Sequence, residues 1–427
     1  MKINTITLPN NLRVVLIDTK AFPSITSILL VNAGSRFENE KNNGVAHFFE
    51  HMAFKGSKKY PDAFTLAAIV DGFGGEFNAF TSKDYTGYYI KAPTIHAETM
   101  VEVLADMIQT PKLQQEEIDR EKGVIVQEIG MYEDTPQKKI YTLYENLLYG
   151  GTPLGMDILG TAKTVTSFDR STFTSYMDSL YYPSNAVFVI AGGFADSGAG
   201  SMDALEEYVK THFGGWKDGS LVPHAPVVDS QDTPQLLLTY KKSEQAHLCF
   251  GYRTFPESDE RKYALSVFAA VLGAGMSSRL FTEVREKRGL CYAVRTMTDH
   301  YSDVGNMLTY AGVSTDVSKV TEAIKVIREQ HENIATKGIS DEELSRAKEL
   351  MKGRLLLSLE DTLNVAFMHG KELLHEGHMT DVQEHMDKID ALSGEDIKKV
   401  AAEVVDSQRT NLALIGPFKE RGVFESI

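Results

Sequence analysis

The chain repeats itself at an offset of about half its length, and this duplication constrains the fold more than any other feature. Residues 116–123 read Glu-Glu-Ile-Asp-Arg-Glu-Lys-Gly, and residues 342–349 read Glu-Glu-Leu-Ser-Arg-Ala-Lys-Glu, at an offset of 226. The Glu-Asp-Thr of residues 133–135 returns at residues 360–362, in nearly the same register. Because self-similarity at a fixed offset is the signature of duplicated structural units, we predict two homologous halves.

The junction between the halves falls in a segment that is rich in glycine and proline, which is typical of turns and linkers. We therefore predict a first half over residues 1–216, a linker over residues 217–234 and a second half over residues 235–427. Within each half, runs rich in Val, Ile, Leu and Tyr alternate with stretches of helical periodicity. This alternation predicts α+β halves in which helices cover an antiparallel or mixed sheet.

The composition of the 427 residues excludes several functional classes. The hydrophobic and charged fractions, 42% and 24%, are those of a soluble globular protein. The net charge of −15 would repel phosphate backbones, so no nucleic-acid partner is expected. No apolar run approaches the ~20 residues that cross a bilayer, and residues 1–16 lack a secretory signal. With only two cysteines, the simplest expectation is a cytoplasmic protein without membrane association.

The sharpest local motif is His-Phe-Phe-Glu-His at residues 47–51. On a helix, His47 and His51 lie ~40° apart around the axis, so both imidazoles can face one ion. Glu50 lies beside them, within reach of a water at that ion, and this inverted order is known among zinc-peptidase motifs. The motif predicts a catalytic zinc site; the alternative is a pair of buried structural histidines near an acid.

A catalytic zinc site normally needs a third protein ligand. Glu121 and Glu128 are seven residues apart on a predicted helix over residues 115–132, so they project from the same face. The duplicate half has Ala347 and Arg354 at the corresponding positions. Both acids are therefore present only in the half that has the histidine pair, which favours a role in the metal site over a role in maintaining the fold. Spacing alone leaves open which acid is the ligand, and acids at this spacing are usually on a solvated helix face.

Together these motifs resemble the pitrilysin/insulinase family of zinc peptidases, in the branch that contains mitochondrial processing peptidase and its bacterial relatives. The resemblance spans the whole chain. The family pattern has 76 residues between the second histidine and a glutamate ligand, as between His51 and Glu128 here. The resemblance implies that His47, His51 and Glu128 hold the zinc, that Glu50 is the general base, and that Glu121 orients a ligand.

Two further segments match the family. The resemblance implies that Asn78, Ala79 and Phe80 bind the substrate backbone by strand addition, although Gly-Gly followed by Asn is also typical of a turn entering a strand. It also implies that Arg285 and Tyr292 stabilise the tetrahedral intermediate, the arginine by holding a substrate carbonyl and the tyrosine by donating to the oxyanion.

The resemblance implies a zinc endopeptidase of two α/β-roll halves that hydrolyses unfolded peptides in a chamber between two chains. This chain carries both the zinc set and the Arg-Tyr pair, so we expect a homodimer in which each zinc site is completed by the partner subunit. The acidic charge balance is compatible with basic peptide substrates. Two alternatives stay open: a non-catalytic structural or regulatory subunit of the same fold, and the zinc-bearing partner in a heterodimeric processing peptidase.

Overall fold

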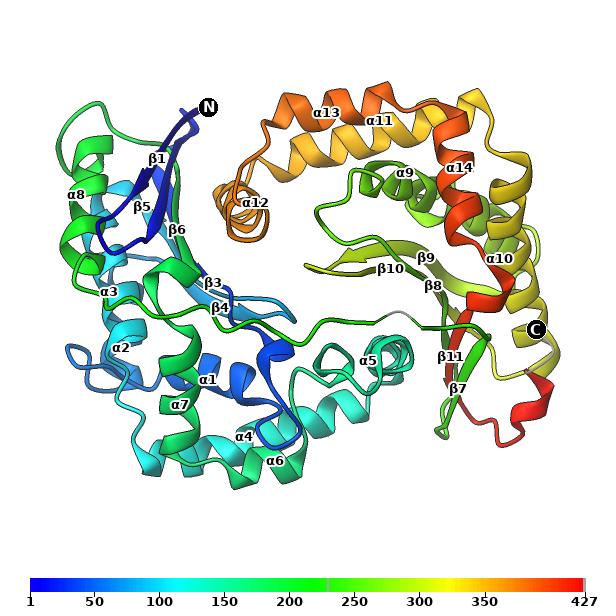
Figure 1. Ribbon diagram of the computed structural model, residues 1–427, viewed down its shortest axis with the longest axis horizontal. Coiled ribbons are helices and arrows are strands. Elements are labelled where there is room, and N and C mark those ends of the chain that lie inside the picture. The colour runs from blue at the N-terminus through cyan, green and yellow to red at the C-terminus, as the bar shows by residue number, and fades with distance from the viewer. Residues whose placement is uncertain (229, 425–427) are drawn as a thin grey trace. The chain divides into compact units, whose positions relative to one another are not determined.

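The computed structural model describes residues 1–228 and 230–424, which form two compact units (Figure 1). Unit 1 contains Met1–Ile129, Asp157–Ala225 and Leu356–Thr380. Unit 2 contains Gly130–Met156 and the described residues of Pro226–Leu355 and Asp381–Ile427. Each unit therefore includes one segment from the far side of the glycine- and proline-rich junction. The boundaries at residues 216 and 235 concern the sequence repeat and stay a prediction.

Unit 1 is built on a six-stranded mixed sheet in the order β1-β2-β6-β3-β5-β4. Only the β2–β6 pair is parallel, and the other neighbours are antiparallel. The strands are β1 (Lys2–Thr7), β2 (Arg13–Asp18), β3 (Ser24–Val31), β4 (Glu76–Thr81), β5 (Thr86–Pro93) and β6 (Ala186–Gly192). Strand β4 lies at one edge of the sheet.

Unit 2 is built on a five-stranded sheet in the order β7-β11-β8-β10-β9, with β7 and β11 parallel. Its strands are β7 (Gln235–Tyr240), β8 (Ala246–Thr254), β9 (Cys291–His300), β10 (Gly305–Val313) and β11 (Asn411–Gly416). Apart from the extra β1, the two sheets have the same strand order and the same single parallel pair. The predicted α+β architecture of two duplicated halves is confirmed at the level of topology.

Helices cover both faces of the unit 1 sheet, which explains why β2 is apolar at successive positions. Val14 and Leu16 face the large core beneath α1, α3, α7 and α8, whereas Val15 and Ile17 face α12. The helices are α1 (Val45–Ala53), α2 (Ala63–Gly72), α3 (Ala97–Gln109), α4 (Gln115–Glu133), α6 (Ala162–Ser167), α7 (Arg170–Leu180), α8 (Met202–Phe213) and α12 (Thr362–His375). Helix α4 crosses into unit 2 at its last residues.

The unit 2 sheet is covered in the same way. Helices α9, α10 and α14 share one core, and α5 packs on the opposite face through Ile140, Tyr144 and Leu148. The helices are α5 (Pro136–Tyr149), α9 (Lys262–Gly273), α10 (Val317–Lys337), α11 (Asp341–Ser358), α13 (Val382–Ala391) and α14 (Gly394–Val404), with a π-helical turn at Phe281–Glu286. Thus α5 of the first half covers the second sheet, and its repeat counterpart α12 covers the first.

Polar contacts hold α12 on the unit 1 sheet. Thr362 Oγ1 lies 2.8 Å from Thr26 Oγ1 in a buried pair, and Lys91 Nζ donates to Asp361, the N-cap, at 2.9 Å. Arg13 Nη1 donates to the Leu373 carbonyl at 2.7 Å, near the C-terminal end where cations are favourable. These contacts fix both ends of the helix.

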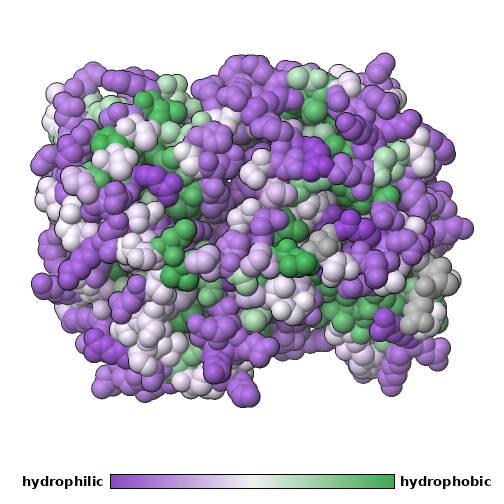
Figure 2. All heavy atoms as spheres, viewed as in Figure 1, coloured by the Kyte–Doolittle hydropathy of each residue, from purple (hydrophilic) through white to green (hydrophobic). Residues whose placement is uncertain are grey.

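The hydrophobic side chains are mostly inside these cores. On the face seen in Figure 2, hydrophilic residues predominate and hydrophobic ones form small separate groups. Within residues 1–228 and 230–424, none of the helices combines the length and the apolar composition that crossing a bilayer would require.

Candidate metal centre and active site

The helix that carries the His-x-x-Glu-His motif, α1, begins at a capped and sterically restricted residue. Gly44, its N-cap, has φ +98°, and a Cβ there would lie 2.8 Å from the Leu159 carbonyl oxygen, so only glycine fits. The buried Glu38 carboxylate accepts hydrogen bonds from the N–H groups of Gly44 and Ala46, both at 2.8 Å, and from the Asn43 amide at 2.9 Å. A carboxylate at the N-terminal end of a helix accepts hydrogen bonds from N–H groups that have no partner within the helix, and its negative charge interacts favourably with the helix dipole.

Helix α1 has two different faces. One packs into the hydrophobic core, and the other bears the motif residues His47, Glu50 and His51. Phe48 and Phe49 pack edge-on against Phe173 and Tyr181, with ring centroids 4.9 and 4.8 Å apart. This packing orients the face that bears the three motif residues. His47 is 8% exposed, and Glu50 and His51 are half-buried.

The structure brings together the three residues that the sequence proposed as metal ligands. Nε2 of His47 and Nε2 of His51 each lie 3.7 Å from Oε2 of Glu128. One potential ligand atom from each residue lies within 4.8 Å of the other two, and this is the group with metal-binding geometry among the described residues. The two imidazole rings meet edge-on with centroids 4.7 Å apart.

This donor set fits zinc. Bonds of ~2.0–2.1 Å at tetrahedral angles place ligand atoms about 3.3 Å apart, close to the 3.7 Å between each histidine Nε2 and Glu128 Oε2. Burial lowers the pKa of His47 to about 3, with a smaller contribution from the charge of the neighbouring His51. The imidazole is therefore neutral, with a lone pair available. Two imidazole nitrogens and one carboxylate oxygen leave a fourth tetrahedral position for water or substrate, as in catalytic rather than structural zinc sites.

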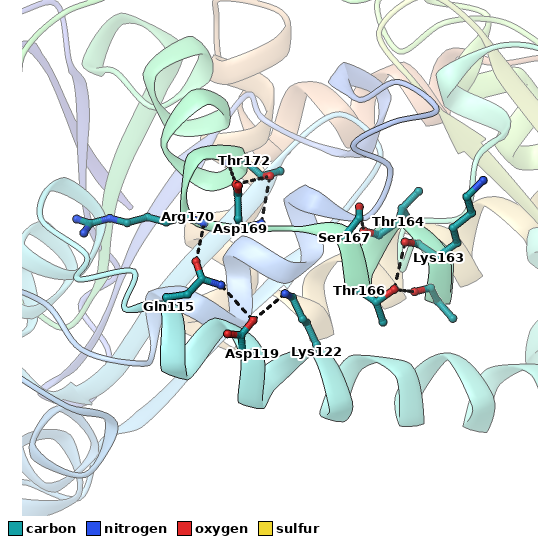
Figure 3. A network of polar contacts seen from close by, with 11 residues as sticks. Gln115, Asp119, Lys122, Lys163, Thr164, Thr166, Ser167, Asp169, Arg170 and Thr172 are labelled. Carbon is teal, nitrogen blue, oxygen red and sulfur yellow. Dashed lines mark hydrogen bonds and ion pairs between the residues drawn. The ribbon is translucent and has the colours of Figure 1, made fainter.

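Helix α4, which supplies Glu121 and Glu128, is anchored at its N-terminal end by the polar network in Figure 3. The Gln115 side chain accepts a hydrogen bond from the Arg170 N–H at 3.2 Å and donates to Asp119 at 3.1 Å. Asp119 also accepts from Lys122 Nζ at 2.7 Å. The Arg170 to Gln115 hydrogen bond ties the first turn of α4 to the start of α7, and the other two contacts lie within α4.

Glu121 and Glu128 have different surroundings: Glu128 lies beside Nε2 of both histidines, whereas Glu121 lies beside the other ring nitrogen of His51. Oε1 of Glu121 lies 2.9 Å from Nδ1 of His51, the ring nitrogen that faces away from the cluster, and Oε2 lies 2.5 Å from Lys55 Nζ. Burial, which raises the Glu121 pKa, is outweighed by these hydrogen bonds, so the pKa is lowered and the carboxylate is ionised. A carboxylate on the second nitrogen of a ligating histidine fixes its tautomer and orientation.

Glu50 lies on the same face of α1 and receives a hydrogen bond from Thr81, whose Oγ1 is 2.5 Å from Glu50 Oε2. Burial raises the pKa of Glu50, although this hydrogen bond and the charge of His51 oppose the shift. A half-buried carboxylate with a raised pKa beside a metal-binding cluster is suited to take up a proton.

The residues proposed to bind substrate lie on β4, the edge strand of the unit 1 sheet. Asn78 is exposed, and its Oδ1 accepts from the Ala79 N–H at 2.9 Å. Phe80 points to the opposite sheet face from Ala79 and packs on Phe367 of α12, with centroids 5.5 Å apart. A sheet edge beside a metal-binding cluster can receive a peptide as an added strand.

Arg285 and Tyr292 belong to unit 2, whereas the metal-binding cluster belongs to unit 1. Arg285 is on the π-helical turn, and Tyr292 is the second residue of β9. The guanidinium carbon lies 5.4 Å from the centre of the Tyr292 ring, so the structure brings these two side chains to each other. Tyr292 is 78% exposed and therefore available to a substrate or partner.

Sequence reasoning missed three residues of this site. Lys55 lies in the turn just after α1, four positions after His51, so its closeness to the motif in the sequence was a usable signal. Thr81 and Glu38 gave no such signal, because their contacts with Glu50 and with the start of α1 arise only when β4 and the loop before α1 pack on the helix.

Comparison of the sequence with known proteins places the chain in a family. The family model described as Insulinase (Peptidase family M16) matches residues 13–162, and the model described as Peptidase M16 inactive domain matches residues 167–351. A Streptomyces coelicolor protein named uncharacterized zinc protease is 34% identical over 97% of this chain and 90% of its own length. The uncharacterized zinc protease YmxG of Bacillus subtilis is 36% identical over 96% of this chain and 97% of its own length.

Two solved structures share the fold. A protease from Helicobacter pylori superposes with a TM-score of 0.89 at 22% identity, covering 97% of this chain and 99% of that one. A Pseudomonas fluorescens protein described as a peptidase M16 inactive domain gives a TM-score of 0.88 at 19% identity, covering 98% and 99%. At these identities the likeness concerns the fold alone.

Proposed function

The chain belongs to the insulinase family, peptidase family M16, and from this premise we propose that it is a zinc-dependent endopeptidase acting on unfolded peptides. The observation that carries the proposal is the convergence of His47, His51 and Glu128, with Glu50 on the same face of α1. A subunit without catalytic function would have no need of a complete ligand set with a base beside it.

His47, His51 and Glu128 would hold the zinc, which would supply Lewis acidity toward a water molecule and the scissile carbonyl. Glu50 removes the proton from the attacking water and later delivers it to the nitrogen of the leaving amine. Glu121 holds the His51 ring in the orientation that presents Nε2 to the site.

The substrate would add as an extended strand to the edge of β4, with backbone contacts from Asn78, Ala79 and Phe80. Backbone recognition of this kind requires an unfolded segment and depends little on side-chain identity. Given the net charge of −15, basic peptides are the substrate class that electrostatics favours.

Arg285 and Tyr292 would hold the substrate carbonyl and donate to the oxyanion that develops during attack. We propose that the pair serving each zinc site comes from the partner subunit of a homodimer, as the family resemblance implies. This chain carries both the ligand set and the pair, so two identical copies suffice.

The experiment is hydrolysis of a quenched fluorescent peptide by zinc-loaded wild type and by Glu50→Gln. The amide keeps the shape of the side chain but cannot take up the proton, so kcat should fall by about 10²–10⁴-fold while zinc content is unchanged. A wild type that binds zinc but hydrolyses none of a diverse peptide set would indicate a non-catalytic subunit. Activity that appears only on adding a second protein would indicate a heterodimer.

A further inference from the structure

The hydrogen bond between Thr81 and Glu50 connects two parts of the site that the proposed mechanism treats separately. Glu50 is on helix α1, and Thr81 is the last residue of β4, directly after the Asn78–Phe80 segment. The 2.5 Å separation of Thr81 Oγ1 and Glu50 Oε2 engages one carboxylate oxygen. Among residues 1–228 and 230–424 the structure shows no hydrogen bond to the other oxygen, Oε1, which would be free to take the proton of the attacking water.

Side-chain alternation on β4 shows that the contact is part of a larger packing arrangement. Phe77, Ala79 and Thr81 share one face of the strand, and Phe77 and Ala79 pack against the core that includes α1. About one turn after Glu50, the ring of Phe54, the C-cap of α1, packs on the Phe77 ring with centroids 4.7 Å apart. Strand β4 is therefore joined to the C-terminal part of helix α1 at two points, by Phe77 near its start and by the Thr81 to Glu50 hydrogen bond at its end.

The position of Thr81 is itself held by the buried turn that follows β4. The N–H groups of Ser35 and Arg36 donate to the carbonyls of Ser82 and Lys83 at 3.1 and 2.9 Å. Arg36 Nη1 donates to Asp84 Oδ1 at 2.8 Å, and both side chains are almost fully buried. The hydroxyl is thus presented from a fixed backbone, as a positioning group must be.

We infer that Thr81 is a positioning residue whose hydroxyl holds the general base in register with the peptide-binding edge of β4. This inference rests on the proposed function. The same strand would then locate both the peptide backbone and the base, so the reacting atoms would be aligned by one rigid element. Misplacement of a base by about 1 Å can cost about 10²-fold in rate, so a single hydroxyl in this place has a measurable effect.

The experiment compares Thr81→Val, which keeps the branched shape and removes the hydroxyl, with Thr81→Ser, which keeps the hydroxyl. The matched control is Thr26→Val, which removes a buried hydroxyl of unit 1 that pairs with Thr362 and does not touch Glu50. Steady-state kcat and KM are measured with a quenched peptide, together with zinc content and the thermal unfolding midpoint of each variant.

Thr81→Val should lower kcat by at least about tenfold with KM changed less than about twofold, because the hydroxyl acts on the base and not on peptide binding. Thr81→Ser should restore most of kcat, and Thr26→Val should keep it. Equal kcat for wild type and Thr81→Val would overturn this inference and leave the proposed function intact. A loss of kcat in Thr81→Ser as large as that in Thr81→Val would do the same. A zinc-loaded wild type without hydrolysis would overturn the proposed function and this inference with it.

Discussion

The carboxylate of Glu121 lies between His51 and Lys55, with Oε1 2.9 Å from His51 Nδ1 and Oε2 2.5 Å from Lys55 Nζ. The lysine stabilises the negative charge of the carboxylate. The carboxylate in turn orients the imidazole of His51, whose other ring nitrogen lies beside Glu128. In the proposed mechanism Glu121 would therefore act on the metal through His51 and not by direct contact.

Replacing Glu121 by Gln removes the charge and weakens the hydrogen bond to His51 Nδ1. We expect zinc affinity to fall by about 10–100-fold, because partners on the second ring nitrogen of a ligating histidine typically contribute that much. Competition with a fluorescent zinc chelator measures the change. Glu117→Gln, one turn earlier on the same helix, where the half-buried side chain pairs with Arg120 and not with His51, is the control and should bind zinc as wild type does. Equal affinity of the two variants would rule out the role assigned to Glu121.

Glu38 should make the stability of the metal-free chain depend on pH. Burial raises the pKa of Glu38 from 4.5 to about 7, although the hydrogen bonds from Ala46, Gly44 and Asn43 and the charge of Lys83 oppose the shift. Because the pKa of this carboxyl is higher in the folded chain than in the unfolded chain, the protonated group stabilises the fold. This stabilisation is fully present below pH 4.5 and is lost as the pH rises through about 7.

The free energy of unfolding of wild type should therefore fall, relative to Glu38→Gln, by about 3 kcal/mol between pH 4.5 and 8. Glutamine does not titrate, so the difference between the two proteins isolates this group. Urea unfolding of both metal-free proteins across this range is the measurement. If the difference in the free energy of unfolding between wild type and Glu38→Gln stays constant with pH, burial does not raise the pKa of the Glu38 carboxyl.

Strand addition to β4 predicts an alternating response to backbone methylation of the substrate. Along an added strand, successive N–H groups point alternately toward the sheet edge and away from it. A peptide series with one N-methyl group at each position in turn should show a raised KM at every second residue near the cleavage site. Mass spectrometry of the products gives the position of cleavage. A response without a period of two would contradict binding at this edge.

Shared sites predict complementation between two inactive chains. In a mixed dimer of Glu50→Gln and Tyr292→Phe, one site carries both substitutions and the other carries neither, if each site draws Tyr292 from the partner. Half of the dimers formed by random exchange are mixed, so the mixture should reach about a quarter of wild-type activity. Each variant alone is the control. A mixture no more active than its components, after verified subunit exchange, would contradict sites built in trans.

The duplication and the α1 motif could be predicted from the sequence because each is a pattern of residue types at a fixed spacing, 226 residues for the duplication and four for the histidine pair. The strand orders of the two sheets repeat as the duplicated blocks indicate, and His47 and His51 share a helix face as four-residue spacing requires. The distant Glu128 was found through the family spacing, and the structure brings it to the histidines.

The remaining features depend on packing between distant segments, which spacing does not encode. Nothing in the apolar pattern of α12 specifies which sheet it covers, so its place on the unit 1 sheet could not be predicted. Thr81 and Glu38 are common residue types without a spacing rule to Glu50 or Gly44. Their roles follow only from the packing of β4 and the loop before α1 on the helix.

The central claim is that His47, His51 and Glu128 hold one catalytic zinc ion, and elemental analysis of the zinc-loaded, gel-filtered chain tests it most directly. We expect about one zinc per chain for wild type and Glu50→Gln, and well below one for His51→Ala and Glu128→Ala, since each loses a ligand. A wild-type chain without stoichiometric zinc, or full zinc content after either ligand is replaced, would contradict the claim.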